Sequence, residues 1–361
     1  MNAIHVAIDL DDTESLIAAD RDGLLRAAST AGAQVRATAA ALDEGALDPV
    51  CGDDRPRTVI WVAGRGTAET AGTILASALG GLAAAPIVVA AEAPAWLGTL
   101  DVLVVAGDDP GDPALVGAAA TGVRRGARVV VVAPYEGPLR DTTAGRVAVL
   151  APRLRVPDEF GLCRYLAAGL ATLQSMDGKL GTDLAALADE LDAEALRNSA
   201  GRELFTNPAK TLAERMSGRS VALVGDGAAT LALARHGSSV LLRVAHQVAA
   251  ATGLADAVVA LRSRLGSGHT HPADALFHDE QIDGWLPERL RVLALTLASD
   301  RTVVAARVAG LDDVDLVGAE DVPDVPGGSP APVGLQRTEQ QLAILAVRLE
   351  MAAVYLRLVQ G

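Results

Sequence analysis

The first residues whose types and spacing could do chemistry are Asp9, Asp11 and Thr13, in the segment VAIDLDDTESL at 6–16. An aspartate can attack a phosphoryl group, a second carboxylate can carry the proton of the leaving group, and both can hold Mg²⁺. The same residues can instead begin a helix, because carboxylates near a helix N-terminus are stabilised by its dipole. The segment therefore has two interpretations, a nucleophile or a helix start.

The spacing D-x-D-x-T is similar to the signature of haloacid-dehalogenase-like phosphatases. GDDPGD at 107–112 follows an apolar run, as the acidic metal-binding motif of those enzymes follows a strand. An aspartate that attacks a dianionic phosphoryl group needs a cation beside it, and the first lysine of the chain is Lys179. The motif also specifies few residues. The phosphatase is kept as a third alternative, behind the two given below.

The elements that would position these residues follow from the apolar pattern. Near-continuous runs of Val, Ile and Ala alternate with small-residue helices, which is typical of a parallel sheet covered on both faces. Strands are predicted at 58–64, 85–93, 101–107, 127–134, 145–152, 220–227, 289–299 and 313–321. Helices are predicted at 12–43, 65–79, 112–126, 159–176, 207–218, 239–253 and 335–360. A strand, a glycine turn and a helix recur at 58–82 and 220–236, which indicates two related halves.

Composition excludes several classes of function. The 361 residues carry a net charge of −14 and only 2% aromatic side chains, which argues against a nucleic-acid binder. The sequence has no basic leader and no uncharged apolar run of about 18 residues, so we expect a cytoplasmic protein without a membrane contact. The two cysteines, Cys51 and Cys163, lack metal-type spacing, and no metal or cofactor is expected.

Five segments, in order, resemble the bifunctional phosphoglucose/phosphomannose isomerases, and among them the divergent actinobacterial branch often labelled TobH. They are LDDTESLIAADRDGLLRAASTAGAQVRATAAAL (10–42), VAGRGTAETAGTIL (62–75), NPAKTLAERMSG (207–218), DALFHDEQIDGW (274–285) and LEMAAVYLRLVQG (349–361). The resemblance implies an α/β fold of two sugar-isomerase (SIS) domains, each a three-layer α/β/α sandwich with a parallel sheet. It implies a helical lead at 1–50, a first domain at 51–176, a helical connection at 177–206, and a second domain with a long C-terminal helix at 207–361.

The resemblance also implies a site for a hexose phosphate. The backbone at Gly64 and Gly66, the hydroxyl of Thr67 and the charge of Arg65 would hold the ligand at the start of a helix. His278 aligns with the group that opens the sugar ring, and Glu280 beside it could carry a proton.

Other positions depart from the family. Asp108 and Asp109 stand where the family has phosphate-binding hydroxyls, and Pro157-Asp158 replaces its Pro-Arg. No carboxylate occurs at 242–249, where the base belongs, and the chain stops at Gly361, before the family's catalytic lysine. We therefore expect a phosphosugar-isomerase-like protein that binds a glucose or mannose 6-phosphate type of ligand in a degenerate site. Whether it is an enzyme stays open, and the alternative is a non-catalytic sugar-phosphate sensor or partner-binding protein.

The aspartates after the third strand leave two interpretations open. Asp108, Asp109 and Asp112 could hold a cation, although solvated aspartates that cap a helix are the commoner case. Asp108 and Asp109 are kept as candidate ligand-binding residues beside the capping interpretation.

The last helix predicts an assembly. Its apolar stripe is too large to face solvent, so a homodimer that buries this helix is expected. The stripe consists of Leu342, Leu345, Val347, Leu349, Ala352 and Leu356.

Overall fold

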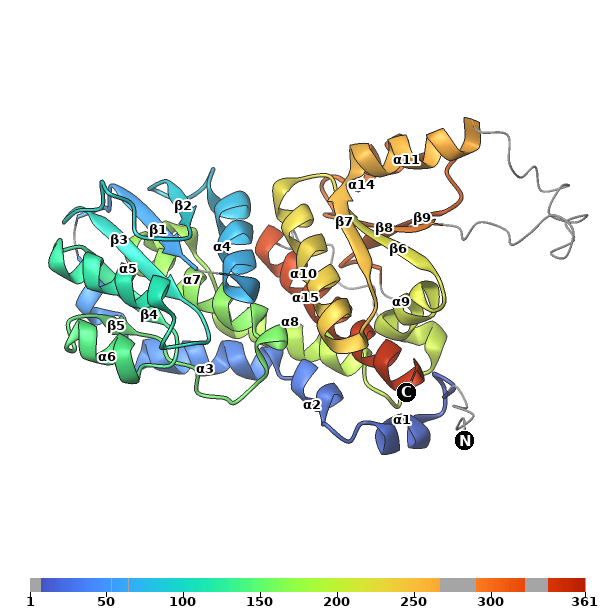
Figure 1. Cartoon of the computed structure of the whole chain (residues 1–361), viewed down its shortest axis with the longest axis horizontal. Coiled ribbons are helices and arrows are strands. Elements are labelled where there is room, and N and C mark those ends of the chain that lie inside the picture. Colours follow the sequence, from blue (N-terminus) through green and yellow to red (C-terminus); the bar gives the residue numbers. More distant parts are fainter. Residues whose placement is uncertain (1–7, 53, 64, 267–289, 322–336, 361) are drawn as a thin grey trace, which may run out of the picture.

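The computed structural model describes residues 8–52, 54–63, 65–266, 290–321 and 337–360, and it contains two parallel sheets (Figure 1). The first sheet has the order β2-β1-β3-β4-β5 and the second the order β7-β6-β8-β9. The strands of the first are β1 (Thr58–Val62), β2 (Ile87–Ala90), β3 (Asp101–Ala106), β4 (Arg128–Val132) and β5 (Ala148–Val149). Those of the second are β6 (Ser220–Gly225), β7 (Ala249–Gly253), β8 (Leu290–Thr296) and β9 (Val314–Gly318).

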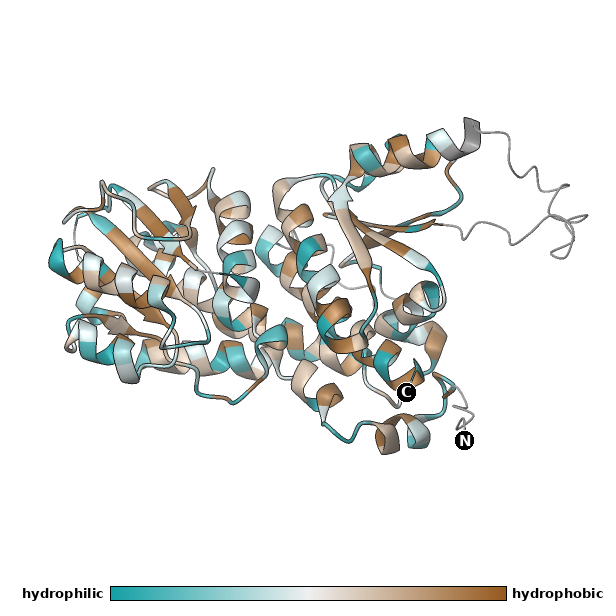
Figure 2. Ribbon diagram, viewed as in Figure 1, coloured by the Kyte–Doolittle hydropathy of each residue, from teal (hydrophilic) through white to brown (hydrophobic). Residues whose placement is uncertain are grey.

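Each sheet is the middle layer of a sandwich, and the alternation of side chains along its strands separates the two faces. On β1, Val59 and Trp61 belong to a core that both sheets share, whereas Ile60 and Val62 belong to a separate outer core. The hydrophobic residues of β1 and β3 appear brown in Figure 2. The shared core is covered by α3 (Ala31–Asp43), α4 (Gly66–Leu79), α7 (Leu162–Met176), α8 (Leu184–Arg197), α9 (Pro208–Met216) and α10 (Ala228–Ala245). The outer cores are covered by α5 (Pro113–Arg124), α6 (Gly137–Thr143), α11 (Leu254–Gly266) and α14 (Arg301–Val308).

The N-terminal lead differs from the single helix predicted at 12–43. It forms three helices, α1 (Thr13–Ala19), α2 (Leu24–Ala28) and α3. The break has a local cause, because the carboxylate of Asp20 accepts hydrogen bonds from the N–H groups of Leu24 and Leu25 and thereby starts a new helix. Gly23 has a φ of +67°, which a helix interior excludes.

The prediction at 239–253 was also wrong in part. Helix α10 begins earlier, at Ala228, and ends at Ala245, because His246 adopts a left-handed conformation with a φ of +54°. The chain then turns into β7, which pairs in register with β6, Val221 opposite Ala249. Its sequence AAATG lacks the branched side chains that mark a strand.

The long helix α15 (Thr338–Gln360) lies at the centre of the molecule and is the feature that corrects the dimer argument. It packs against α10, α9, α8, α2 and α7. The stripe predicted to need a partner is covered by the chain itself, since each of its members is at most 2% exposed. The apolar stripe therefore gives no reason for a homodimer. None of the helices within the described ranges is long and apolar enough to cross a membrane.

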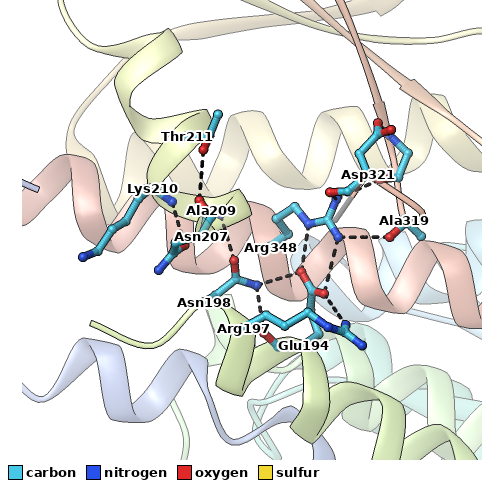
Figure 3. A network of polar contacts seen from close by, with 11 residues as sticks. Glu194, Arg197, Asn198, Asn207, Ala209, Lys210, Thr211, Ala319, Asp321 and Arg348 are labelled. Atoms are coloured by element: carbon cyan, nitrogen blue, oxygen red, sulfur yellow. Dashed lines mark hydrogen bonds and ion pairs between the residues drawn. The ribbon is translucent and has the colours of Figure 1, made fainter. Parts of the chain in front are cut away.

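A buried ion pair ties α15 to α8 (Figure 3). The Nε of Arg348 lies 2.8 Å from Oε1 of Glu194, and the two side chains are 1% and 0% exposed. Arg348 also donates to the carbonyls of Gly318 and Ala319, while Asn198 donates to Glu194. Burial alone raises the pKa of the Glu194 carboxyl, but the Arg348 guanidinium outweighs it, so that the pKa is lowered. The pair thus joins the end of the second sheet to the helices of the shared core.

Candidate functional site

The predicted glycine turn lies between β1 and α4. Gly64 is outside the described residues; Arg65 is extended, and Gly66 has a φ of +68°, a conformation that favours glycine. Helix α4 has 14 residues, so the N–H groups of its first turn have no partner within the helix. The hydroxyl of Thr67 is buried here and donates to Oδ2 of Asp158 over 3.2 Å.

Two of the aspartates after β3, Asp109 and Asp112, accept hydrogen bonds from the local backbone. Asp109 accepts from the N–H of Gly111, and Asp112 caps α5 by accepting from the N–H of Ala114, each over 2.8 Å. Asp108 and Asp109 are exposed. Capping is therefore confirmed for Asp112, and within the described ranges no group of three or more His, Cys, Asp or Glu could hold a metal ion. Arg65 lies 3.9 Å from Asp112, so the turn and this loop are neighbours at one edge of the sheet.

The catalytic candidates His278 and Glu280 fall in 267–289, outside the described residues. His246 is described and ends α10, with Nη1 of Arg357 3.2 Å from its Nε2. It therefore has a structural role at a helix end.

A cleft lies between α4 and α10, the corresponding first helices of the two sheets, which pack side by side in Figure 1. It encloses about 250 Å³. Its polar lining comes from the N-terminal half of α4 and from one face of α10. The two arginines of the lining are both on α10. The residues are Gly66, Thr67, Glu69, Thr70, Thr73, Ala232, Arg235, His236, Ser239, Val240 and Arg243. The sequence predicted the α4 side of this cleft but not the α10 side.

The two arginines of the cleft differ in their partners. Arg243 is held by two carboxylates, Asp158 at 3.3 Å and Glu159 at 2.8 Å. The resemblance implied an arginine at 158 and a carboxylate near 242–249, so this chain has the two charges reversed, and the reversed pair is in contact. Arg235 is exposed and makes no ion pair with any residue that the structure describes.

A buried histidine–carboxylate pair lies beside these charges. Nε2 of His236 on α10 is 2.8 Å from Oε1 of Glu350 on α15, with side chains 2% and 1% exposed. Burial raises the pKa of Glu350; the hydrogen bond from His236 lowers it, and the charges of Glu159 and Asp158 raise it further. The signal in the sequence was weak, because a single buried histidine or glutamate on a helix is common in protein cores.

Asp9, Asp11 and Thr13 form a helix start, which removes the geometric basis of the phosphatase alternative. Asp11 accepts from the N–H of Leu204, and Thr13 donates to the carbonyl of Ala200. The neighbouring Asp12 caps α1. A lysine does lie near them: burial lowers the pKa of Lys210, and the charges of Asp11 and Asp9 oppose that change.

The side chain of Lys210 is hydrogen-bonded to backbone carbonyls. Its Nζ donates to the carbonyls of Ala200 and Arg202, over 2.8 and 2.7 Å. It therefore fastens α9 to the loop before it, and the ammonium is not directed at an attacking carboxylate.

Known proteins resemble the chain in structure. No protein-family model matches it, and no curated protein matches it in sequence. The tagatose-6-phosphate ketose/aldose isomerase from Escherichia coli superimposes with a TM-score of 0.61 at 14% identity, over 99% of this chain and 96% of that one. A glucose-6-phosphate isomerase-like protein from Thermus thermophilus gives 0.53 at 19% identity, over 98% and 96%.

A third structure is the C-terminal domain of glucosamine-fructose-6-phosphate aminotransferase from Francisella tularensis, with a TM-score of 0.57 at 10% identity over 95% of this chain and 98% of that one. At such identities the similarity shows the fold alone. The predicted fold class is confirmed: two α/β/α sandwiches with parallel sheets and a long C-terminal helix, as in phosphosugar isomerases.

Proposed function

We propose that this protein binds a hexose phosphate, of the glucose or mannose 6-phosphate type, in the cleft between α4 and α10. The observation that carries the proposal is Arg235, a cation without an ion pair among the described residues, in one cavity with the first turn of α4 and the hydroxyl of Thr67. A helix N-terminus with unpaired N–H groups favours an anion, and an arginine matches the geometry of phosphate. The cavity, at about 250 Å³, suits a small ligand.

Isomerisation through the residues implied by the family is expected to be slow. Carboxylates stand where phosphate-binding hydroxyls were implied, and Arg243 occupies the region of the missing base. The proposal therefore includes a sensor that binds the sugar phosphate with little turnover. Membership of the bifunctional phosphoglucose/phosphomannose isomerases, and of their TobH-like branch, is proposed on the sequence resemblance together with the shared fold.

Binding is tested by replacing Arg235 with glutamate. We expect calorimetry with glucose 6-phosphate, mannose 6-phosphate and fructose 6-phosphate to show at least one ligand, with its dissociation constant raised about tenfold or more in Arg235→Glu. The reason is that a charge pair at about 4 Å contributes about 1 kcal/mol even in water, and the substitution reverses its sign. Arg262→Glu on α11 is the matched control, because it changes the net charge equally outside the cleft.

The outcomes separate the alternatives. Equal weakening by Arg235→Glu and Arg262→Glu would place the ligand elsewhere or reduce the effect to net charge. Binding of inorganic phosphate with the same affinity as the sugar phosphates would remove the hexose from the proposal. The absence of binding by all three sugars would contradict the proposed function.

We also propose a homodimer, now on the grounds of the family resemblance alone, since α15 is covered within its own chain. Sedimentation equilibrium at micromolar concentration is expected to give twice the 36.8 kDa mass of the chain. A monomer mass over the whole concentration range would contradict this.

A further inference from the structure

We infer that His236, oriented by Glu350, is the proton-transfer group of the cleft between α4 and α10. The inference rests on the proposed function, because it needs a sugar phosphate in that cleft. It assigns to α10 and α15 a chemical role that neither the glycine turn nor the carboxylates after β3 can fill. The expected slow turnover would pass through this pair.

The geometry is that of an imidazole fixed by a carboxylate. His236 lines the cavity, and its Nε2 lies 2.8 Å from Oε1 of Glu350. This is the one hydrogen bond of the ring within the part of the chain that the structure describes, so Nδ1 is left for a ligand. A carboxylate that holds one ring nitrogen fixes the tautomer and orientation of the ring and stabilises the cation formed when the other nitrogen takes a proton.

The pair of His236 and Glu350 is buried and has charged groups around it. Glu350 is buried in the shared core, and its pKa is raised by that burial. Nearby, Cys163 on α7 is buried, and its pKa is raised by burial and by the charge of Glu350. Among the described residues, the other titratable and charged groups that face the pair or share its cavity are Glu69 on α4, Arg235 and Arg243 on α10, and Asp158 and Glu159 before α7.

The step is a proton transfer that needs no further reactant. With the open-chain sugar bound, His236 takes a proton from the carbon beside the carbonyl; the C–H bond breaks and its electron pair forms the C=C bond of an enediolate. The carbonyl oxygen takes the negative charge, which the arginines of the cleft favour. Return of the proton to the same carbon restores the sugar. Its return to the neighbouring carbon gives the isomer, provided that the hydroxyl proton of the enediolate passes from one oxygen to the other, so that the first becomes the new carbonyl and the second the new hydroxyl. While the proton is on the imidazole it can exchange with solvent.

The test is the incorporation of deuterium from D₂O into fructose 6-phosphate, followed by NMR with the sugar at saturating concentration. We expect slow incorporation with the wild type and a rate about 10²–10⁴-fold lower in His236→Gln, with the dissociation constant unchanged within about twofold. Glutamine can keep a hydrogen bond to Glu350, so the fold is expected to persist, as circular dichroism would report. Glu350→Gln tests the positioning role: the exchange rate falls about tenfold or more while the dissociation constant stays the same.

His246→Gln is the matched control, because it makes the same substitution at the end of the same helix, at an exposed residue that does not line the cavity, and it is expected to leave exchange unchanged. If His236→Gln does not fold, the split between rate and affinity in Glu350→Gln decides. Exchange that survives in the folded His236→Gln variant, or that disappears instead in His278→Ala, overturns the inference. Binding without any exchange in the wild type overturns it and leaves the proposed function intact, whereas no binding overturns the proposed function itself.

Discussion

Replacement of Arg348 by methionine is expected to lower the free energy of unfolding by about 3–5 kcal/mol. The substitution leaves the carboxylate of Glu194 buried, at 0% exposure, with its main counter-charge removed. It also removes the hydrogen bonds that Arg348 donates to the carbonyls of Gly318 and Ala319. Urea unfolding, followed by circular dichroism at neutral pH, measures the loss.

Two further variants distinguish the loss of a buried counter-charge from the loss of an arginine in general. The double variant Arg348→Met with Glu194→Leu is expected to recover part of the loss, because no charge then stays buried alone. Arg301→Met is the control: Arg301 pairs with Asp321 and Glu320 at the surface, so its loss costs at most about 1 kcal/mol. A cost for Arg348→Met as small as that for Arg301→Met would show that the buried pair does not hold the core together.

The second large effect is expected from Gly72→Ala in α4. A Cβ at this position would lie 2.3 Å from Cδ1 of Trp61 and 2.6 Å from its Nε1. The indole cannot easily move, because it is 2% exposed and donates to the carbonyl of Ala68 over 2.9 Å. Overpacking of this kind costs about 1–3 kcal/mol or more, which exceeds the gain of up to about 1 kcal/mol from alanine in a helix.

Gly117→Ala in α5 is its matched control. No atom lies within 4 Å of a Cβ built there, so the same substitution is expected to stabilise the protein by about 0.5–1 kcal/mol. Thermal unfolding of both variants is the measurement. Because α4 carries Thr67 into the cleft, Gly72→Ala should also weaken sugar-phosphate binding, while Gly117→Ala leaves it unchanged. Equal shifts of the two melting temperatures would contradict the packing argument.

The sequence predicted the strands and the first side of the cleft for a physical reason. Fully buried parallel strands need apolar residues on both faces, so β1, β3, β4, β6 and β8 appear as Val-, Leu- and Ala-rich runs. The glycine turn comes immediately after β1 in the chain, so predicting the strand also located the turn. The strand β7 was missed because AAATG has the small residues of a helix and only its pairing with β6 makes it extended. The lead was predicted as one helix because helical periodicity does not register the side-chain cap at Asp20.

The second side of the cleft could not be predicted in the same way. His236 and Glu350 are separated by 114 positions, and their meeting depends on how α10 and α15 cross. The ion pair of Arg243 and Asp158 could not be predicted either, because each residue, taken alone in the sequence, is typical of a solvent-exposed position. A short stretch of sequence shows the periodicity of one helix or strand. Contacts between residues of different elements depend on how those elements pack, which a short stretch does not show.

The central position of α15 has a consequence for biosynthesis. Its residues are translated after both sheets, yet they complete the core against α7 and α4 of the first sheet as well as α10 of the second. A ribosome adds about 5–20 residues per second, so the apolar faces of the first half wait for many seconds before their covering helix leaves the exit tunnel. During that interval the nascent chain presents unburied leucine and valine surface, and the final collapse joins both halves after most of the chain has been synthesised.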